Sequence, residues 1–344
     1  MLPDVRQMQV VRSNRWPADP FGAMTNRSML SSKGSWPVEV TMSAPAPLSP
    51  WPALDYPTFV ETQHLLHMGL QAIGKLKLHE PFQPQWAGVA LWLTARGLTA
   101  GPLTSHDRTF EVQVDFVSHE VSCATNDGRQ DRFGLAAMSV AHFVKALLGM
   151  LRRVGIATRI TMLPQEVSDR TPFDRDDQVR AYDASMANTW WRILLRTQHV
   201  MRTFEGTFEG KTQPIGLMWG TFDIRMALYN GKPATPAPDS DFIRRNAMNA
   251  ELIEVGWWSG SEAYPKPAFY AFAYPQPPGI EHASILPSAA RWDSAMGEFI
   301  LDYDRLVASE RPDHDLLAFI RTTYEAGARS AGWDASLIGS GRPT

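Results

Sequence analysis

Residues Thr109–Val117, TFEVQVDFV, form the clearest β-strand pattern in this 344-residue chain. Apolar and polar residues alternate along the stretch, with the apolar ones at Phe110, Val112, Val114 and Phe116. This alternation is typical of an antiparallel strand that is buried on one face and solvated on the other. The sequence Asn126-Asp127-Gly128 follows, and because these residues tolerate a positive φ it predicts a hairpin turn.

Helical patterns flank this region and return in the second half of the chain. Apolar residues spaced three and four apart predict helices over residues 59–78, 140–154, 184–204 and 315–329. Strands are predicted over residues 87–95, 215–229, 251–258, 268–274 and 298–302. The order helix, antiparallel strands, helix therefore occurs twice. It predicts an α+β protein of antiparallel sheets with packed helices, with 51–165 and 180–335 as two possible similar halves.

The first fifty residues differ from the rest of the chain. They are rich in Ser, Pro and Ala and show no sustained apolar period. Such segments cannot bury enough apolar surface to offset the entropy lost on ordering. We therefore expect residues 1–50 to be a disordered N-terminal arm and residues 51–340 to form one globular unit.

Composition excludes several classes of protein. Apolar residues make up 44% of the chain and charged residues 20%, which is ordinary for a globular protein. The net charge of −3 indicates no general affinity for nucleic acid or for an anionic membrane. No apolar run reaches the roughly 18 residues of a spanning helix, and the first residues do not resemble a signal peptide. The single cysteine, Cys123, fits a reducing compartment, so a cytoplasmic protein is expected.

Residues 211–225, KTQPIGLMWGTFDIR, place charges in a strand-like apolar stretch. The charged side chains are Lys211, Asp223 and Arg225, and they accompany Trp219 and Phe222. Charges are costly to bury unless they are paired or functional, so this stretch predicts a polar site in apolar surroundings. Lys211 and Asp223 are candidate catalytic residues there, and Trp219 and Phe222 are candidate ligand contacts.

Residues 268–274, AFYAFAY, carry aromatic side chains on one strand face. Tyr270, Phe272 and Tyr274 share that face, and the opposite face holds Phe269 and the small Ala271 and Ala273. The small face can lie beneath a helix, whereas the aromatic face can line a ligand pocket with Tyr270 and Tyr274 as contacts. Alternatively, these aromatic rings belong to the core.

A third candidate strand contains two glutamates, Glu251 and Glu254, and runs into Trp257-Trp258. A carboxyl group beside a tryptophan can have a raised pKa and act as a general acid or base. Glu251 is therefore a candidate catalytic residue and Trp258 a candidate ligand contact. The alternative is a solvated strand end.

Arg96 shares a predicted strand face with Trp92 and Thr94. An arginine in an aromatic setting can bind an anion or a carboxylate, which makes Arg96 a catalytic candidate and Trp92 a ligand contact. An arginine that ends a strand and bonds loop carbonyls is the alternative.

Histidines allow a metal hypothesis. Glu61, His64 and His67 lie three apart on a predicted helix and can face one side. However, no HExxH or CxxC motif supplies a second ligand pair, so no metal site is predicted. His67 continues through Gln71 and Lys75 as a polar stripe that is either solvated or faces a cavity, and His67 is kept as a catalytic candidate.

Seven stretches together resemble one protein family. They are WPAL, HMGLQAIGK, LTARGLT, RTFEVQVDF, GKTQPIGLMWGTFD, PAFYAFAYPQPPG and TTYEAGARSAGWD, spread between Trp51 and Trp333. The chain resembles the uncharacterised bacterial proteins of domain-of-unknown-function family 5996. The resemblance implies a shared fold and a shared pocket but no established activity. It also implies that relatives carry histidines at the positions of Gly216 and Ala250.

Two main hypotheses follow for the function. The first is a cytoplasmic enzyme that acts on a small organic molecule in an aromatic-lined pocket, in which Lys211, Asp223, Glu251 and Arg96 supply charge and proton transfer. The second is a non-catalytic small-molecule-binding or partner protein that has lost the family histidines. A metal-dependent enzyme is a further alternative. The sequence leaves the reaction, any cofactor and the oligomeric state open.

Overall fold

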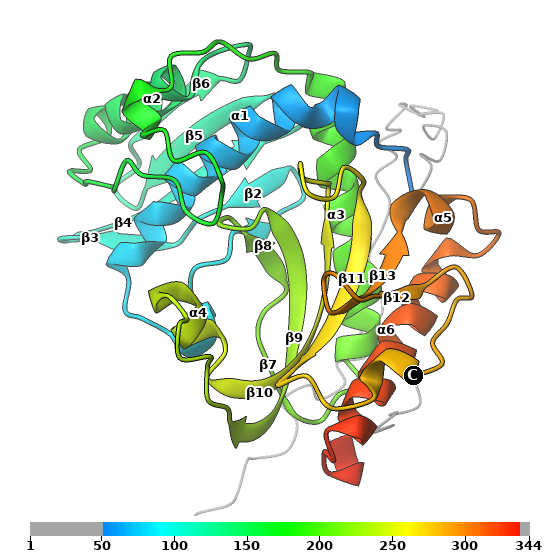
Figure 1. The fold of residues 1–344 in the computed structure, drawn as a ribbon. Coiled ribbons are helices and arrows are strands. Elements are labelled where there is room, and N and C mark those ends of the chain that lie inside the picture. Colours follow the sequence, from blue (N-terminus) through cyan, green and yellow to red (C-terminus); the bar gives the residue numbers. More distant parts are fainter. Residues whose placement is uncertain (1–50, 338–344) are drawn as a thin grey trace, which may run out of the picture. The chain divides into compact units, whose positions relative to one another are not determined.

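Residues 92–134 fold into an antiparallel sheet of six strands (Figure 1). The computed structural model describes residues 51–337. The strands are β1 (Trp92–Leu93), β2 (Gly97–Thr99), β3 (Leu103–Ser105), β4 (Arg108–Asp115), β5 (Glu120–Thr125) and β6 (Gln130–Gly134). They run in the order β1-β2-β4-β5-β6, and β3 also pairs with β4. The predicted hairpin turn joins β5 to β6, where Gly128 adopts a φ of 86°.

The second half forms a larger antiparallel sheet of seven strands. These are β7 (Lys211–Thr212), β8 (Gly216–Met218), β9 (Asp223–Pro233), β10 (Ala250–Trp258), β11 (Ala268–Tyr274), β12 (Arg291–Asp293) and β13 (Glu298–Asp302). The order is β12-β13-β11-β10-β9-β7, and β8 also pairs with β9. A bridge between Leu91 and Leu217 connects the two sheets through backbone hydrogen bonds of 2.8 and 2.9 Å.

Six α-helices of the described part of the chain accompany the sheets. They are α1 (Tyr56–Gly74), α2 (Val140–Arg153), α3 (Ala184–Glu205), α4 (Phe242–Ala247), α5 (Tyr303–Val307) and α6 (Pro312–Ser330). Asp55, Ser139 and Asp183 cap α1, α2 and α3, because each side chain accepts a hydrogen bond from the backbone amide three residues later. The protein is therefore of the α+β class, as the sequence predicts.

Two of the predicted strands differ in the structure. Only Trp92–Leu93 of residues 87–95 is a strand, because residues 84–89 form turns and Arg96 lies in the tight turn before β2. Residues 215–229 are broken into β8 and β9 by a turn in which the Phe222 amide bonds to the Met218 carbonyl at 2.8 Å. Phe222 adopts a φ of 61° there, a conformation that strand periodicity does not reveal.

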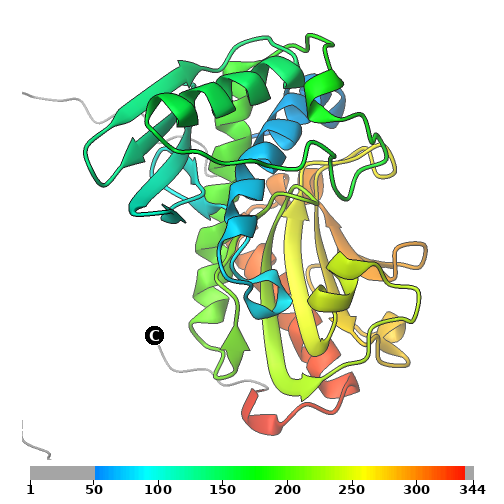
Figure 2. The ribbon, with the colours of Figure 1, turned by 90° about the vertical axis from the view of Figure 1, so that its left-hand side faces the viewer.

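Helices cover one face of the second sheet, as Figure 2 shows from the side. Helices α3, α5 and α6 pack on the face that carries Ile224, Val255, Trp257, Phe269 and Leu301, all of them fully buried. Small residues allow the close approach that the sequence predicts, since Gly327 of α6 lies against Ala273 of β11. No long helix among residues 51–337 covers the opposite face of β9, β10 and β11, and this face forms the site described below.

Some expectations fall outside what the structure tests. The predicted N-terminal arm, residues 1–50, lies outside the described residues. The similarity of the two halves stays a prediction. Within residues 51–337, no helix is long and apolar enough to cross a membrane.

Candidate functional site

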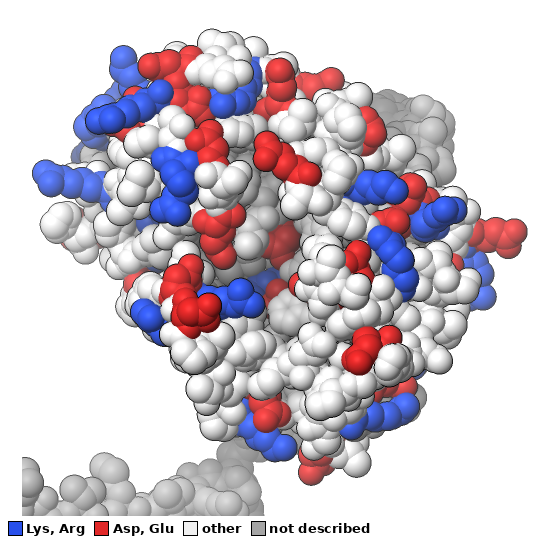
Figure 3. Space-filling view, viewed as in Figure 1, with Lys and Arg blue, Asp and Glu red and all other residues white. Residues whose placement is uncertain are grey.

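The uncovered face of the second sheet is the floor of a cleft with a volume of about 2190 Å³. Figure 3 shows the hollow near the middle of this face, with acidic side chains around and inside it. Helix α1, the loop around Glu166, residues 81–89 and α4 supply its walls. Five of the nine large apolar side chains exposed in the described part line this cleft: Val60, Leu78, Phe82, Phe242 and Met296. An apolar mouth of this kind suits an organic ligand better than an inorganic ion.

Strand register brings charged side chains from distant parts of the sequence together on the floor. Arg225, Gly256 and Tyr270 are direct neighbours across β9, β10 and β11. Residues that pair directly in an antiparallel sheet point to the same face, as do residues two apart on one strand. Asp223 and Glu254 therefore lie beside Arg225 and Tyr270 on the floor.

These four side chains form one hydrogen-bonded chain. The Tyr270 hydroxyl lies within hydrogen-bonding distance of Asp223 Oδ2 and of Glu254 Oε1, the latter at 3.1 Å. Arg225 Nη1 donates to Glu254 Oε2 at 2.5 Å. Asp223, Glu254 and Tyr270 are each only 5% exposed. A phenol has a single proton, so it can donate to only one of the two carboxyl groups. The other contact is a hydrogen bond only when that carboxyl group carries a proton.

The electrostatics indicate where this proton lies. Burial raises the pKa of Asp223 and of Glu254, and the Arg225 charge opposes this rise at both. Only Glu254 forms a direct ion pair with the guanidinium, so we place the negative charge on Glu254 and the proton on Asp223. Asp223 then donates to Tyr270, and Tyr270 donates to Glu254. The buried Asp223 acid, the Tyr270 phenol and the Glu254 carboxylate thus form a line of hydrogen bonds along which a proton can pass.

Two more carboxyl groups face the same cleft. Burial and the nearby Glu254 carboxylate raise the pKa of Glu166 and of Glu298 to about 7. Glu166 is exposed as a whole residue while its Oε2 lies against Gly220, whereas Glu298 Oε2 is buried and has no hydrogen-bond partner in the described part of the chain. Both groups therefore exchange protons near neutral pH, as general acids and bases do.

Glycines make room for this arrangement. A Cβ atom at Gly256 would lie 2.3 Å from the Tyr270 hydroxyl oxygen, so the phenol rests directly on the glycine backbone. A Cβ atom at Gly220 would lie 2.0 Å from Glu166 Oε2. A glycine inside a strand pattern indicates such a close approach, and Gly256 in residues 250–258 is therefore a sequence signal for the site.

The structure places eight of the eleven predicted site residues on the cleft. They are His67, Trp92, Trp219, Phe222, Asp223, Trp258, Tyr270 and Tyr274. Trp258 stacks on Tyr270 with ring centroids 4.9 Å apart, and Phe222 stacks on Trp190 at 4.8 Å. Trp219 is almost fully buried and donates to the Val89 carbonyl at 3.0 Å, so it supports the wall rather than projecting from it.

His67 holds the turn that precedes Asp223. Its Nε2–H donates to the Gly220 carbonyl at 2.9 Å, and burial lowers the pKa of the ring to about 4. The next residue of the polar stripe, Gln71, donates to the Gln165 carbonyl at 2.8 Å. The stripe therefore faces two loops of the cleft wall. With that pKa the His67 ring is neutral at physiological pH and holds the turn before Asp223, and its catalytic role stays a prediction.

Three predicted catalytic residues do not line the cleft. Lys211 is exposed on β7, with its ammonium 5.9 Å from the centre of the Tyr229 ring. Glu251 accepts a hydrogen bond from Asn230 at the end of β10, on the face opposite to Glu254 because the two are an odd number of residues apart.

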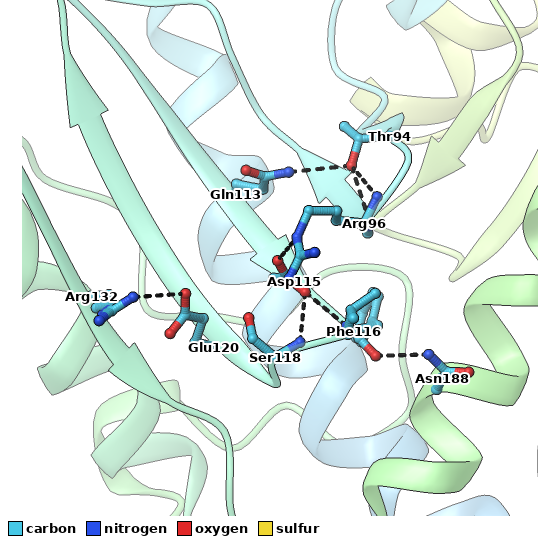
Figure 4. A network of polar contacts seen from close by, with 11 residues as sticks. Thr94, Arg96, Gln113, Asp115, Phe116, Ser118, Glu120, Arg132 and Asn188 are labelled. Atoms are coloured by element: carbon cyan, nitrogen blue, oxygen red, sulfur yellow. Dashed lines mark hydrogen bonds and ion pairs between the residues drawn. The ribbon is translucent and has the colours of Figure 1, made fainter. Parts of the chain in front are cut away.

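Arg96 also lies outside the cleft, and its side chain contacts a carboxylate and not the loop carbonyls of the alternative. It pairs with Asp115, whose other carboxylate oxygen accepts from the Val117 and Ser118 amides at 2.7 and 2.8 Å (Figure 4). Half of the Arg96 side chain is exposed. The pair fastens the turn before β2 to the end of β4, far along the first sheet from the acidic floor.

Four charged residues of the cleft were not among the predicted site residues: Arg225, Glu254, Glu298 and Glu166. Strand parity could have found Glu254, which shares a face with Trp258, and Arg225, which shares a face with Asp223. Glu298 lies at the start of a predicted strand, but its neighbour in the next strand is not visible in the sequence. Glu166 is in a loop without any periodic signal.

The two positions at which relatives are expected to carry histidines lie near this floor. Gly216 pairs with Arg225, so a side chain there would point toward the cleft. In this chain a Cβ atom at Gly216 would lie 3.0 Å from the Trp92 ring and 2.9 Å from the Leu91 carbonyl oxygen. Trp92 therefore occupies the space that a larger side chain would need. Ala250 packs with Tyr229 and Leu252 at the far end of the floor.

The histidine pair proposed for a metal is engaged elsewhere. His64 Nε2 lies 3.4 Å from Asp176 Oδ2, and His67 bonds to Gly220. Within residues 51–337, no three His, Cys, Asp or Glu side chains group closely enough to hold a metal ion.

Fold and site together define an α+β protein of two antiparallel sheets with an acidic, aromatic-lined cleft on the second sheet. The chain belongs to a family of unknown function, DUF5996, whose family model matches residues 51–340. Searches among curated proteins and among solved structures give no significant match.

Proposed function

We propose that this protein is an enzyme that binds a small polar organic molecule in the cleft and transfers protons to and from it. The observation that carries this proposal is the Asp223–Tyr270–Glu254–Arg225 chain, buried at the floor of a cleft with aromatic walls. A buried carboxyl group costs stability unless it is neutral or paired, and such groups cluster at functional sites.

Each floor residue has a definite role in this proposal. Asp223, protonated in the free protein, is the proton donor, and Glu254 is the acceptor at the other end of the Tyr270 hydroxyl. Arg225 keeps Glu254 ionised through their ion pair. Glu166 and Glu298, with pKa values of about 7, exchange protons between the floor and water in the cleft.

The aromatic residues provide binding. Trp258 and the buried Phe222 line the cleft, and the apolar mouth around Phe82 and Phe242 accepts a hydrophobic part of the ligand. The cytoplasmic location expected from the sequence fits this proposal and stays a prediction.

A deuterium experiment separates catalysis from binding alone. A library of small amines, carboxylic acids and amino acids is first screened for molecules that raise the thermal midpoint of unfolding. Each stabilising molecule is then incubated with the protein in deuterium oxide and followed by mass spectrometry for product or for deuterium exchanged into carbon positions. We expect at least one to be converted or exchanged, and Asp223→Asn and Glu254→Gln to lower the rate by 10²-fold or more.

Glu251→Gln is the matched control, since it makes the same change three residues away on the same strand but outside the cleft. Its rate should equal that of the wild type. If Glu251→Gln and not Glu254→Gln abolished the reaction, the assignment would be wrong. Stabilisation without conversion or exchange of any molecule would instead favour the non-catalytic binding protein.

A further inference from the structure

Lys77 is a buried ammonium group that the proposed function does not use. It follows α1 in a short 3-10 turn and is only 6% exposed, yet it lines the cleft. Its Nζ lies 4.8 Å from the centre of the Trp92 ring. Within residues 51–337, this Nζ has no hydrogen bond or ion pair. The aromatic ring face compensates only part of the cost of removing an ammonium group from water.

Lys75, two residues earlier, is a buried lysine whose ammonium group has hydrogen-bond acceptors. It is 2% exposed, and its Nζ donates to Thr161 Oγ1 at 2.9 Å and to Gln165 Oε1 at 3.3 Å. The acid nearest in sequence to Lys77, Glu80, uses its Oε1 to accept from the Thr104 amide at 2.6 Å. Of these two lysines, only Lys77 keeps its donors free toward the cleft.

We propose that Lys77 and Trp92 form a subsite that binds a carboxylate group of the ligand. This inference rests on the proposed function, because it takes the cleft to be the ligand site. A single ammonium over a ring face offers one positive charge, which matches a monoanionic carboxylate better than a phosphate dianion. Burial lowers the pKa of Lys77 to about 8, so the group is still mainly charged at neutral pH.

The subsite and the acidic floor lie in the same cleft, on the two sides of Trp92. The Trp92 ring lies under Lys77 and its edge abuts Gly216, which pairs with Arg225 of the floor. A ligand that engages both places carries a carboxylate at one end. At its other end it carries the group that gains or loses a proton.

Differential lysine labelling tests the subsite directly in the full-length protein. The probe is benzoate, and benzamide is its uncharged counterpart. Lysines are methylated with formaldehyde and cyanoborohydride, and the rate at each lysine is read by peptide mass spectrometry. We expect millimolar benzoate to slow methylation of Lys77 by at least tenfold, while benzamide has no effect. The exposed Lys145 and Lys232 should react at the same rate with or without benzoate.

A second measurement uses variants. Benzoate should raise the thermal midpoint of the wild type and of Lys145→Met, and it should not raise that of Lys77→Met. Equal protection of Lys77 by benzamide, or no protection by benzoate, would overturn the proposal. Stronger protection by inorganic phosphate than by benzoate would overturn the carboxylate assignment.

Failure of this subsite can be told from failure of the proposed function. In Asp223→Asn the proton-transfer floor is disabled, but Lys77 and Trp92 are untouched, so benzoate should still protect Lys77. Protection of Lys77 together with no conversion of any molecule would refute the catalytic proposal alone. Conversion without protection of Lys77 would refute the subsite alone.

Discussion

Tyr270 occupies the centre of the acidic floor, where its hydroxyl separates two carboxyl groups that would otherwise face each other directly. The ring is held from above by Trp258 and from below by the bare backbone of Gly256. Burial and the adjacent Glu254 carboxylate raise the pKa of Tyr270 well above its usual value, so the phenol stays protonated. Its role is to carry a proton between acids and not to ionise.

Tyr270→Phe should destabilise the protein by about 1–3 kcal/mol, because two buried carboxyl groups lose a hydrogen-bond partner. Urea unfolding at pH 7 measures this difference. Tyr274→Phe is the matched control on the same strand face; its hydroxyl donates only to the Thr235 carbonyl near the surface. Its cost should be about 1 kcal/mol or less. Equal costs for the two variants would contradict the hydrogen-bonded chain.

At the scale of elements, the end of α1 packs against the turn after β8, and each holds the other in place. The Trp219 indole lies across Gly74, and a Cβ atom there would be 2.2 Å from its Cδ1. His67 and Gln71 of the same helix hold Gly220 and Gln165. Helix α1 therefore positions the loops that carry Glu166, Phe222 and Asp223, although it supplies no proton-transfer group itself.

Gly74→Ala tests this packing. Replacing a helical glycine by alanine ordinarily stabilises a protein by up to about 1 kcal/mol. At Gly74 the added methyl group must displace Trp219, so we expect a loss of about 1–3 kcal/mol instead. Gly149→Ala in α2 is the control, because the nearest atoms to its Cβ belong to the flexible Arg153 side chain. Thermal unfolding of both variants should give shifts of opposite sign.

At the scale of the whole molecule, the acidic floor makes stability depend on pH. Glu166 and Glu298 have pKa values of about 7 in the folded protein, above their ordinary value of 4.5. The folded state therefore binds more protons than the unfolded state between about pH 4.5 and 7. Stability conferred by these groups falls as the pH rises through that window.

Glu298→Gln should remove part of this dependence. At pH 8 the variant should be more stable than the wild type by on the order of 1 kcal/mol, after allowance for solvent screening of a half-buried group. At pH 5 the variant should gain nothing, because Glu298 is then protonated in the folded protein. Urea unfolding at both pH values gives the comparison, with the exposed Glu310→Gln as a control that should not alter the slope. A larger gain at pH 5 than at pH 8 would reverse the sign and refute the assignment.

Local sequence patterns predict most of the helices and strands and the aromatic face. Alternation in 109–117 and 268–274 and helical spacing in 184–204 and 315–329 depend on local periodicity, so the α+β class could be predicted. The same parity placed Tyr270 and Tyr274 on one face, and the embedded charge at Asp223 indicated a buried polar site.

Which charged side chains meet depends on contacts between distant parts of the chain. Arg225, Glu254 and Tyr270 are joined through the register of three strands, and Glu166 reaches them from a loop that lies against Gly220. Pairing between strands is set by long-range packing, which leaves no periodic trace in the sequence. Three predicted residues lie outside the cleft for the same reason: Lys211, Glu251 and Arg96. They have suitable chemistry and suitable neighbours in the sequence. However, Lys211 is on an exposed strand, Glu251 is on the other sheet face and Arg96 is in a turn of the first sheet.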